Sequence, residues 1–251
     1  MLSVMVKLSG EGALIDSVLI GRVFCFLCVL SFILYPERNV LNLKSGSCII
    51  FHSLHWKQLS IPLLAAMLAI LLQLADPTST ELFRFNRSAI EAGEWWRLLT
   101  GNFCHLSWNH LWVNLLGLVL MVGLFLRSLT ISWWFGLLLL GSAIEGAMLF
   151  IVTPHVHHYV GLSGILHGVI VVGAVLDFKR DRVVNAVLLV GLTGKLIWEQ
   201  SSYYLDDMAQ FIGGNVLVES HLIGSIVGVA VLLVGLTGRY FLKTDRCSLY
   251  R

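Results

Sequence analysis

The 251 residues are 57% hydrophobic and only 13% charged, with 17 Lys and Arg against 15 Asp and Glu. A soluble domain carries about 25% charged residues, so this composition excludes the soluble enzyme folds and indicates a membrane protein. The net charge of +2, with no basic cluster beyond residues 179–182, excludes nucleic acid as a partner.

Residues 1–58 form an N-terminal extension with one apolar run, Ala13 to Tyr35, which Asp16 and Arg22 interrupt. Three interpretations stay open: an extra membrane span, a re-entrant or interfacial helix, or sequence upstream of the true start codon. No convincing signal-peptide cleavage site follows the run. The Cys25/Cys28 pair lies inside it, and we interpret the pair as packing residues because a reactive thiol needs an electropositive, accessible setting.

Six further runs approach the roughly 20 apolar residues that a spanning helix needs. They are apolar at nearly every position, which favours helices over the alternating strands of a barrel. The sequence thus predicts an all-α membrane protein, a bundle of six core helices with a possible seventh before them. The membrane domain is placed at 59–238 and a cytoplasmic tail at 239–251. The predicted spans are 59–75, 108–126, 131–152, 160–176, 183–198 and 216–236.

The distribution of basic residues predicts the orientation, because Lys and Arg are retained in the cytoplasm. The segments after the first, third and fifth spans hold only Arg84, Arg87 and Arg97. The even-numbered ends and the C-terminus are therefore expected in the cytoplasm. The basic residues after the second, fourth and sixth spans are Arg127, Lys179, Arg180, Arg182, Arg239, Lys243, Arg246 and Arg251.

Glycines cluster in the fourth and sixth spans, at Gly161, Gly164 and Gly168 and at Gly224 and Gly228. Small residues four apart let helix backbones approach closely in lipid. We therefore expect these two spans to touch.

Polar side chains inside a span are unfavourable in lipid and indicate function. Four of them, His110, Asn114, Ser163 and His221, lie near the starts of the second, fourth and sixth spans, which all begin on the outer side. These residue types suit acyl transfer: a serine hydroxyl with a histidine base, and donors for the oxyanion. His110 and Asn114, four apart, project from one helix face, and the serine backbone N–H is free at a helix start. A dyad without an acid is an accepted variant of the triad.

Three motifs carry these residues: HLWVN at 110–114, GLSG at 161–164 and HLIGSIVG at 221–228, with a Trp96-Arg97 pair in the first outer loop. In this order they match HxxxN, GxSG and HxxGxxxG, and over residues 59–238 the chain resembles the rhomboid intramembrane serine proteases. The sequence around the motifs looks most like the rhombosortase subgroup, which is associated with proteins bearing a C-terminal GlyGly-CTERM sorting tail.

The resemblance implies an intramembrane serine endopeptidase with Ser163 as nucleophile and His221 as general base. His110, Asn114 and the Ser163 N–H would hold the oxyanion, and Gly161 would shape that pocket. Trp96 and Arg97 would be structural parts of the outer loop. The expected substrate is a membrane-anchored protein with a transmembrane helix, cut at the outer face of a bacterial inner membrane, with neither cofactor nor metal.

Two other functions are weighed against this one. A catalytically inactive relative would bind transmembrane helices without cutting them, and intact Ser163 and His221 argue against it. A transporter would need ion ligands near the midplane of broken helices. There is no HExxH and there are no facing aspartates in two spans, which excludes the zinc and aspartyl intramembrane proteases.

Several polar residues keep open roles. His167 is expected to make an interhelical hydrogen bond, and Glu145 and Lys195 to be structural partners. Glu219 has no role in the pattern. The loop histidines His155, His157 and His158 have no Cys or acid partner nearby in sequence, so a metal site is not expected there.

Overall fold

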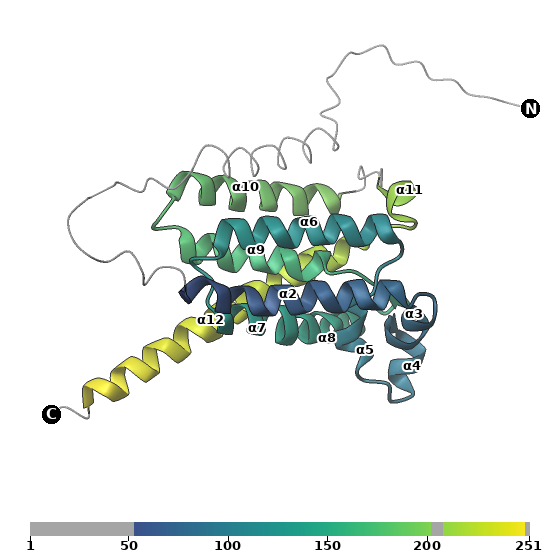
Figure 1. Ribbon diagram of the computed structural model, residues 1–251, viewed down its shortest axis with the longest axis horizontal. Coiled ribbons are helices and arrows are strands. Elements are labelled where there is room, and N and C mark those ends of the chain that lie inside the picture. Colours follow the sequence, from purple (N-terminus) through teal and green to yellow (C-terminus); the bar gives the residue numbers. More distant parts are fainter. Residues whose placement is uncertain (1–52, 202–207, 249–251) are drawn as a thin grey trace, which may run out of the picture. The chain divides into compact units, whose positions relative to one another are not determined.

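The computed structural model describes residues 53–201 and 208–248, with side chains for 57–201 and 208–237. The predictions on residues 1–52, including the apolar run and its CxxC, lie outside this part. Within the described residues the protein is mostly helical, with one short two-stranded sheet, which agrees with the predicted class (Figure 1).

The long helices follow the predicted spans closely. They are α2 (Ser53–Leu74), α6 (Trp108–Phe125), α9 (Ser163–Asp177), α10 (Arg182–Glu199) and α12 (Val218–Ser248). The third predicted span is one continuous helical segment made of α7 (Ile131–Phe135), a π-helical stretch η2 (Gly136–Gly141) and α8 (Ser142–Val152). Helix α12 continues past residue 238, where the tail was predicted to begin.

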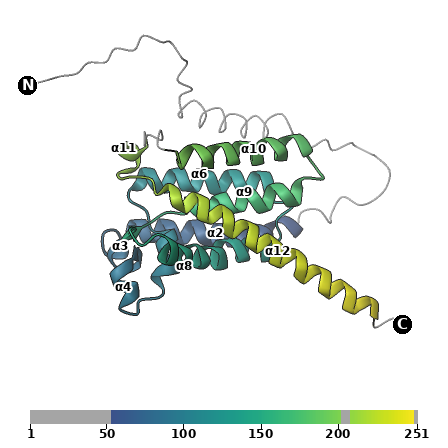
Figure 2. The same ribbon diagram turned by 180° about the vertical axis from the view of Figure 1, so that it is seen from behind.

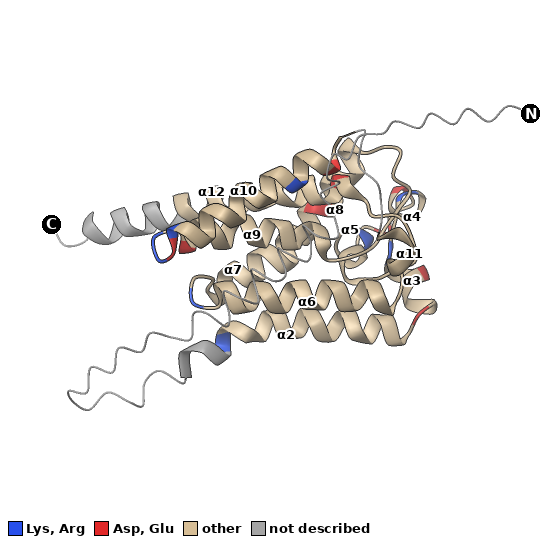
Figure 3. Cartoon of the chain, turned by 90° about the horizontal axis from the view of Figure 1, so that it is seen from above, with Lys and Arg blue, Asp and Glu red and all other residues tan. Residues whose placement is uncertain are grey.

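Four helical segments in the described part of the chain are long and apolar enough to cross a membrane: Lys57–Leu74, Trp108–Phe125, Ile131–Val152 and Val218–Thr237. Helix α9 is apolar but shorter, and α10 carries Arg182, Lys195 and Glu199 within its 18 residues. Figure 3 shows most charged residues towards the ends of the helices, with long uncharged stretches along α2 and α6. The chain is therefore an integral membrane protein, and the count of six spans stays a prediction.

Helix α9 forms the centre of the bundle and packs against α12, α6 and α10. Figures 1 and 2 show α12 crossing α9 at a slant. At the crossing a Cβ built on Gly168 would lie 2.6 Å from the Gly224 carbonyl oxygen, and a Cβ on Gly228 would lie 2.6 Å from the Gly168 Cα. The predicted contact between these two spans is confirmed, since only glycine allows backbones this close.

The segment between α2 and α6 contains α3 (Thr78–Phe83), β1 (Phe85–Asn86), α4 (Arg87–Glu91), α5 (Arg97–Thr100) and the 3₁₀ turn η1 (Gly101–Phe103). Strand β1 pairs antiparallel with β2 (His158–Tyr159), which lies just before α9. The first loop is thereby tied to the chain that leads into Ser163.

Two buried arginines hold this loop together. The Arg87 guanidinium donates to four backbone carbonyls at the end of α8 and in the turn after it: Leu149, Phe150, Thr153 and Val156. Arg97 donates to the Glu81 and Arg84 carbonyls and pairs with Glu94 at 2.6 Å. A guanidinium offers five N–H donors in a rigid planar fork, against three on the single nitrogen of a lysine, which suits it to several acceptors spread around it.

Candidate active site

Ser163 is the first residue of α9, where backbone N–H groups have no partner within the helix. Its side chain is only partly buried. The backbone turn that precedes Ser163 needs a glycine at position 161. Gly161 has φ +119°, and a Cβ there would lie 2.8 Å from the His110 ring. The turn therefore brings the serine to the helix start with the His110 imidazole against the backbone of the turn.

His221 lies in the first turn of α12, which begins at Val218, and is buried. Its Nε2 lies 3.0 Å from the Ser163 Oγ, so the hydroxyl and the imidazole are in hydrogen-bond contact. The contact exists because α9 and α12 cross with their glycines touching and their first turns side by side. This is the geometry that a serine nucleophile and its base require.

His110 and Asn114 lie on one face of α6, as their spacing predicts, and both are buried. Ser107 caps the helix start by accepting a hydrogen bond from the His110 N–H at 3.2 Å. The Leu106 N–H donates to His110 Nδ1 at 3.3 Å, so in the neutral ring Nε2 carries the proton. That nitrogen faces the turn, since a Cβ on Gly161 would lie 2.9 Å from it.

Asn114 uses one of its two amide hydrogens on the His110 carbonyl at 3.0 Å. Its Nδ2 would lie 3.8 Å from a Cβ on Gly161, next to the His110 ring. His110, Asn114, Ser163 and His221 all line one cavity of about 380 Å³. The structure thus brings together the four polar residues singled out in the sequence, and Gly161 between them.

His105 lies just before α6 and packs its neutral ring against His110. Burial lowers the pKa of His105 to about 3, and its ring meets the His110 ring edge-on with centroids 5.0 Å apart. Cys104 beside it is also buried, and this burial raises the pKa of the thiol to about 12. The cysteine therefore stays a thiol and does not compete with Ser163 as a nucleophile.

Glu145 and Tyr159 support the turn from the other side. The Tyr159 hydroxyl donates to the Gly161 carbonyl at 2.7 Å and lies 3.2 Å from a carboxylate oxygen of the fully buried Glu145. Burial raises the pKa of Tyr159 well above its usual range, so the hydroxyl stays protonated and remains a donor. These contacts are compatible with the structural role expected of Glu145, which stays a prediction.

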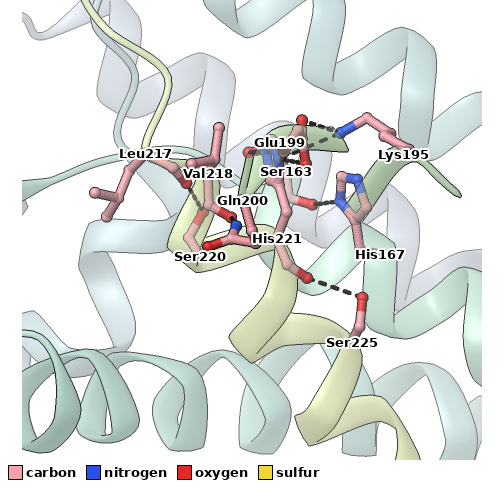
Figure 4. A network of polar contacts seen from close by, with 10 residues as sticks. All are labelled: Ser163, His167, Lys195, Glu199, Gln200, Leu217, Val218, Ser220, His221 and Ser225. Atoms are coloured by element: carbon pink, nitrogen blue, oxygen red, sulfur yellow. Dashed lines mark hydrogen bonds and ion pairs between the residues drawn. The ribbon is translucent and has the colours of Figure 1, made fainter. Parts of the chain in front are cut away.

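Glu199 was not singled out from the sequence, because it lies one residue beyond the predicted end of its span. In the structure both of its oxygens lie 3.0 Å from His221 Nδ1, on the side of the ring opposite Ser163 (Figure 4). The Lys195 ammonium pairs with the same carboxylate and lies 3.3 Å from His221 Nδ1. The available signal was the spacing of four between Lys195 and Glu199, which places both on one face of α10.

The interhelical hydrogen bond expected of His167 is not what the structure shows. Its Nδ1 lies 2.6 Å from the Ser163 carbonyl, one turn back on α9 itself. Its contact with α12 is a stack, with the His167 and His221 ring centroids 4.2 Å apart and the planes 19° from parallel. His167 therefore forms its hydrogen bond within α9 and stacks the face of its ring on His221.

In the described part of the chain, His167, Glu199 and His221 are the one group whose ligand atoms lie close enough to consider a metal ion, within 4.8 Å of one another. Their geometry does not favour one. The two rings are nearly parallel, so their in-plane lone pairs do not converge on one point, and the Lys195 ammonium already contacts the carboxylate. The arrangement instead fits an imidazole with a carboxylate and a hydroxyl on its two nitrogens.

Trp96, Arg97 and Glu219 lie outside the cavity, whereas the loop histidine His158 is among the residues that line it. Arg97 is buried in the outer loop, and the exposed Trp96 donates from Nε1 to the Leu82 carbonyl at 3.3 Å. Both fit the structural role that the sequence suggested. Glu219 lies 3.3 Å from the ring of the loop histidine His155.

A comparison with protein-family models matches the Rhomboid domain at residues 92–238, which is more than half of the chain. A comparison with curated proteins gives no match.

Proposed function

The chain belongs to the rhomboid family, whose members are generally intramembrane serine proteases, and on this premise we propose that it cleaves membrane-anchored proteins with Ser163 as nucleophile and His221 as general base. The single observation that carries the proposal is the 3.0 Å contact between Ser163 Oγ and His221 Nε2 inside the polar cavity. An inactive relative that only binds helices has no use for this contact.

The reaction follows from the geometry. As Ser163 Oγ forms a bond to the scissile carbonyl carbon, its proton passes to His221 Nε2 and the carbonyl electron pair moves onto oxygen. The proton then goes to the leaving amine as the C–N bond breaks. Water then attacks the carbonyl carbon of the acyl-enzyme and gives a proton to His221 Nε2. As the bond between that carbon and Ser163 Oγ breaks, His221 returns the proton to Ser163 Oγ and the new carboxyl terminus leaves.

The oxyanion pocket is assigned to the His110 Nε2–H, the free Asn114 amide hydrogen and the Ser163 backbone N–H, with Gly161 shaping it. All three donors border the same turn, and none depends on a mobile charged side chain. Donors that are already in place when negative charge develops need no reorganisation, which is the main source of their effect.

We expect His110→Ala and Asn114→Ala each to lower kcat by roughly 100-fold with little change in KM, because these donors act on the tetrahedral oxyanion and not on the bound helix. Steady-state cleavage of a membrane substrate in proteoliposomes measures both constants. Asn185→Ala is the control: it removes a buried amide that bonds Asp177 at 3.1 Å near the start of α10, and should lower stability without changing kcat. Equal kcat values for all three variants would remove the oxyanion assignment.

The proposed substrate is a C-terminal tail helix of an exported protein, in line with the rhombosortase likeness, cut at the outer face of a bacterial inner membrane. The orientation is supported by the helix directions: α6, α9 and α12 all begin at the cavity, and Arg127 and residues 179–182 follow the far ends of α6 and α9. A scissile peptide must also be unwound before attack, which glycines in the tail favour.

Two reporters test the proposal. One carries a tail helix preceded by a Gly-Gly pair, and the other has the same helix with Ala-Ala, each co-reconstituted with the purified protein. Mass spectrometry of the products identifies the bond that is cut. We expect cleavage of the first reporter; equal cleavage of both would argue against the sorting-tail preference, and binding of both without cleavage would support the inactive alternative.

A further inference from the structure

Resting on the proposed protease function, we propose that Glu199 of α10 is a positioning residue for the general base, so that the site works as a Ser163–His221–Glu199 triad. The sequence motifs supply two of these residues and leave the far side of the imidazole unassigned. The structure places a buried carboxylate there.

The hydrogen-bond chemistry fixes the tautomer of His221. An ionised carboxylate can only accept, so the Nδ1 that lies 3.0 Å from both Glu199 oxygens carries the ring proton. Nε2 then holds the lone pair, and it faces Ser163 Oγ at 3.0 Å. The Glu199 carboxylate therefore selects the one neutral form of the ring that can accept the serine proton.

Burial makes this contact strong. The side chains of Glu199 and His221 are each 6% exposed, so little water competes for the Nδ1–H. When Nε2 takes the serine proton, the ring becomes a cation in contact with the carboxylate. Glu199 keeps its negative charge throughout and stabilises this cation without receiving the proton.

Lys195 contacts the Glu199 carboxylate and does not itself set the tautomer of His221. Its ammonium pairs with Glu199 one turn along α10, and its side chain is 43% exposed. An ammonium and an Nδ1–H are both donors, so the 3.3 Å between them reflects two donors sharing one carboxylate. We assign Lys195 to holding the Glu199 carboxylate in its orientation.

The other groups that face the His221 ring are Ser163 and His167 on α9. His167 stacks on the ring with its own Nδ1 on the Ser163 carbonyl, so it fixes the ring plane but makes no bond to either ring nitrogen. Glu199 is therefore the acceptor that sets the tautomer.

The test compares Glu199→Gln with Lys195→Met and with the double variant in the proteoliposome assay. Glu199→Gln keeps the shape and lets the ring adopt the wrong tautomer, so we expect kcat to fall by roughly 10²- to 10⁴-fold with KM nearly unchanged. In Lys195→Met we expect kcat to fall by less than about tenfold, because the Glu199 carboxylate remains. If Glu199 and Lys195 were only a structural ion pair, the neutral double variant would regain activity; we expect it to stay as slow as Glu199→Gln.

Glu219→Gln is the matched control, since it removes a carboxylate two residues before His221 whose partner is His155. It should cleave at the wild-type rate. Glu199→Asp keeps the charge on a shorter side chain and should recover part of the rate lost in Glu199→Gln.

Proton NMR of protein labelled with ¹⁵N-histidine gives a readout that needs no turnover, and its measurement on the wild type alone already tests which ring nitrogen carries the proton. We expect a strongly deshielded His221 Nδ1–H signal in the wild type and in Ser163→Ala, and its loss in Glu199→Gln. A proton on Nε2 in the wild type would overturn the inference. Wild-type cleavage by Glu199→Gln, with none by Ser163→Ala, would overturn only the triad, whereas cleavage by Ser163→Ala would overturn the proposed function itself.

Discussion

Ser163→Ala is expected to abolish cleavage of the membrane reporter, with a drop in kcat of about 10⁶-fold, as when a serine nucleophile is removed from a soluble protease. The His221 Nε2 would then face a methyl group. The Ser220 hydroxyl, which also lines the cavity, donates to the Leu217 carbonyl at 2.7 Å, and burial raises the pKa of the Cys104 thiol to about 12, so neither is an activated nucleophile. The same variant should lose labelling by a serine-directed fluorophosphonate, because the reagent needs the activated hydroxyl.

The fold should survive this substitution. Ser163 is at a helix start and partly exposed, and its hydroxyl makes one hydrogen bond to His221, so the loss of stability should be about 1 kcal/mol. Thermal unfolding in detergent micelles measures it. Ser132→Ala on α7, an exposed serine, is the control and should be labelled and cleave like the wild type. Cleavage by Ser163→Ala at a comparable rate would show that the nucleophile has been assigned wrongly.

The positions of the site residues could be predicted because each lies near the start of an apolar run. Span direction then follows from the basic loops, and three helices that begin on one side bring Ser163, His221 and the His110 face of α6 to one depth. The spacing of the glycines in α9 and α12 similarly predicted that these two helices touch. What these signals share is that they are local in the sequence.

The parts that could not be predicted depend on side-chain directions across helices. Nothing in the run of α10 shows that Glu199 turns towards α12, because a carboxylate at a span end is equally typical of an interfacial residue. His167 could be placed one turn along from Ser163, yet whether its ring bonds another helix or stacks on His221 depends on the crossing geometry. The same holds for the hydrogen bonds by which Arg87 joins the outer loop to the end of α8.

The second large effect concerns the α9–α12 contact. Helix α9 carries Ser163 and α12 carries His221, and the two backbones touch where a Cβ on Gly224 would overlap the Gly164 carbonyl group. Because the obstacle is backbone and not the end of a flexible side chain, the helices must move apart to admit even a methyl group.

We therefore expect Gly224→Ala to lower the free energy of unfolding by about 3 kcal/mol or more, the upper range for overpacked sites, and to abolish cleavage by separating Ser163 Oγ from His221 Nε2. Thermal unfolding and reporter cleavage are measured on the same preparation. Gly194→Ala on α10 is the matched control, since a Cβ there has no neighbour within 4 Å, and it should stabilise slightly, by up to about 1 kcal/mol. If Gly224→Ala unfolds and cleaves like Gly194→Ala, the two helices do not depend on backbone contact, and the 3.0 Å approach of serine to histidine must be held by other means.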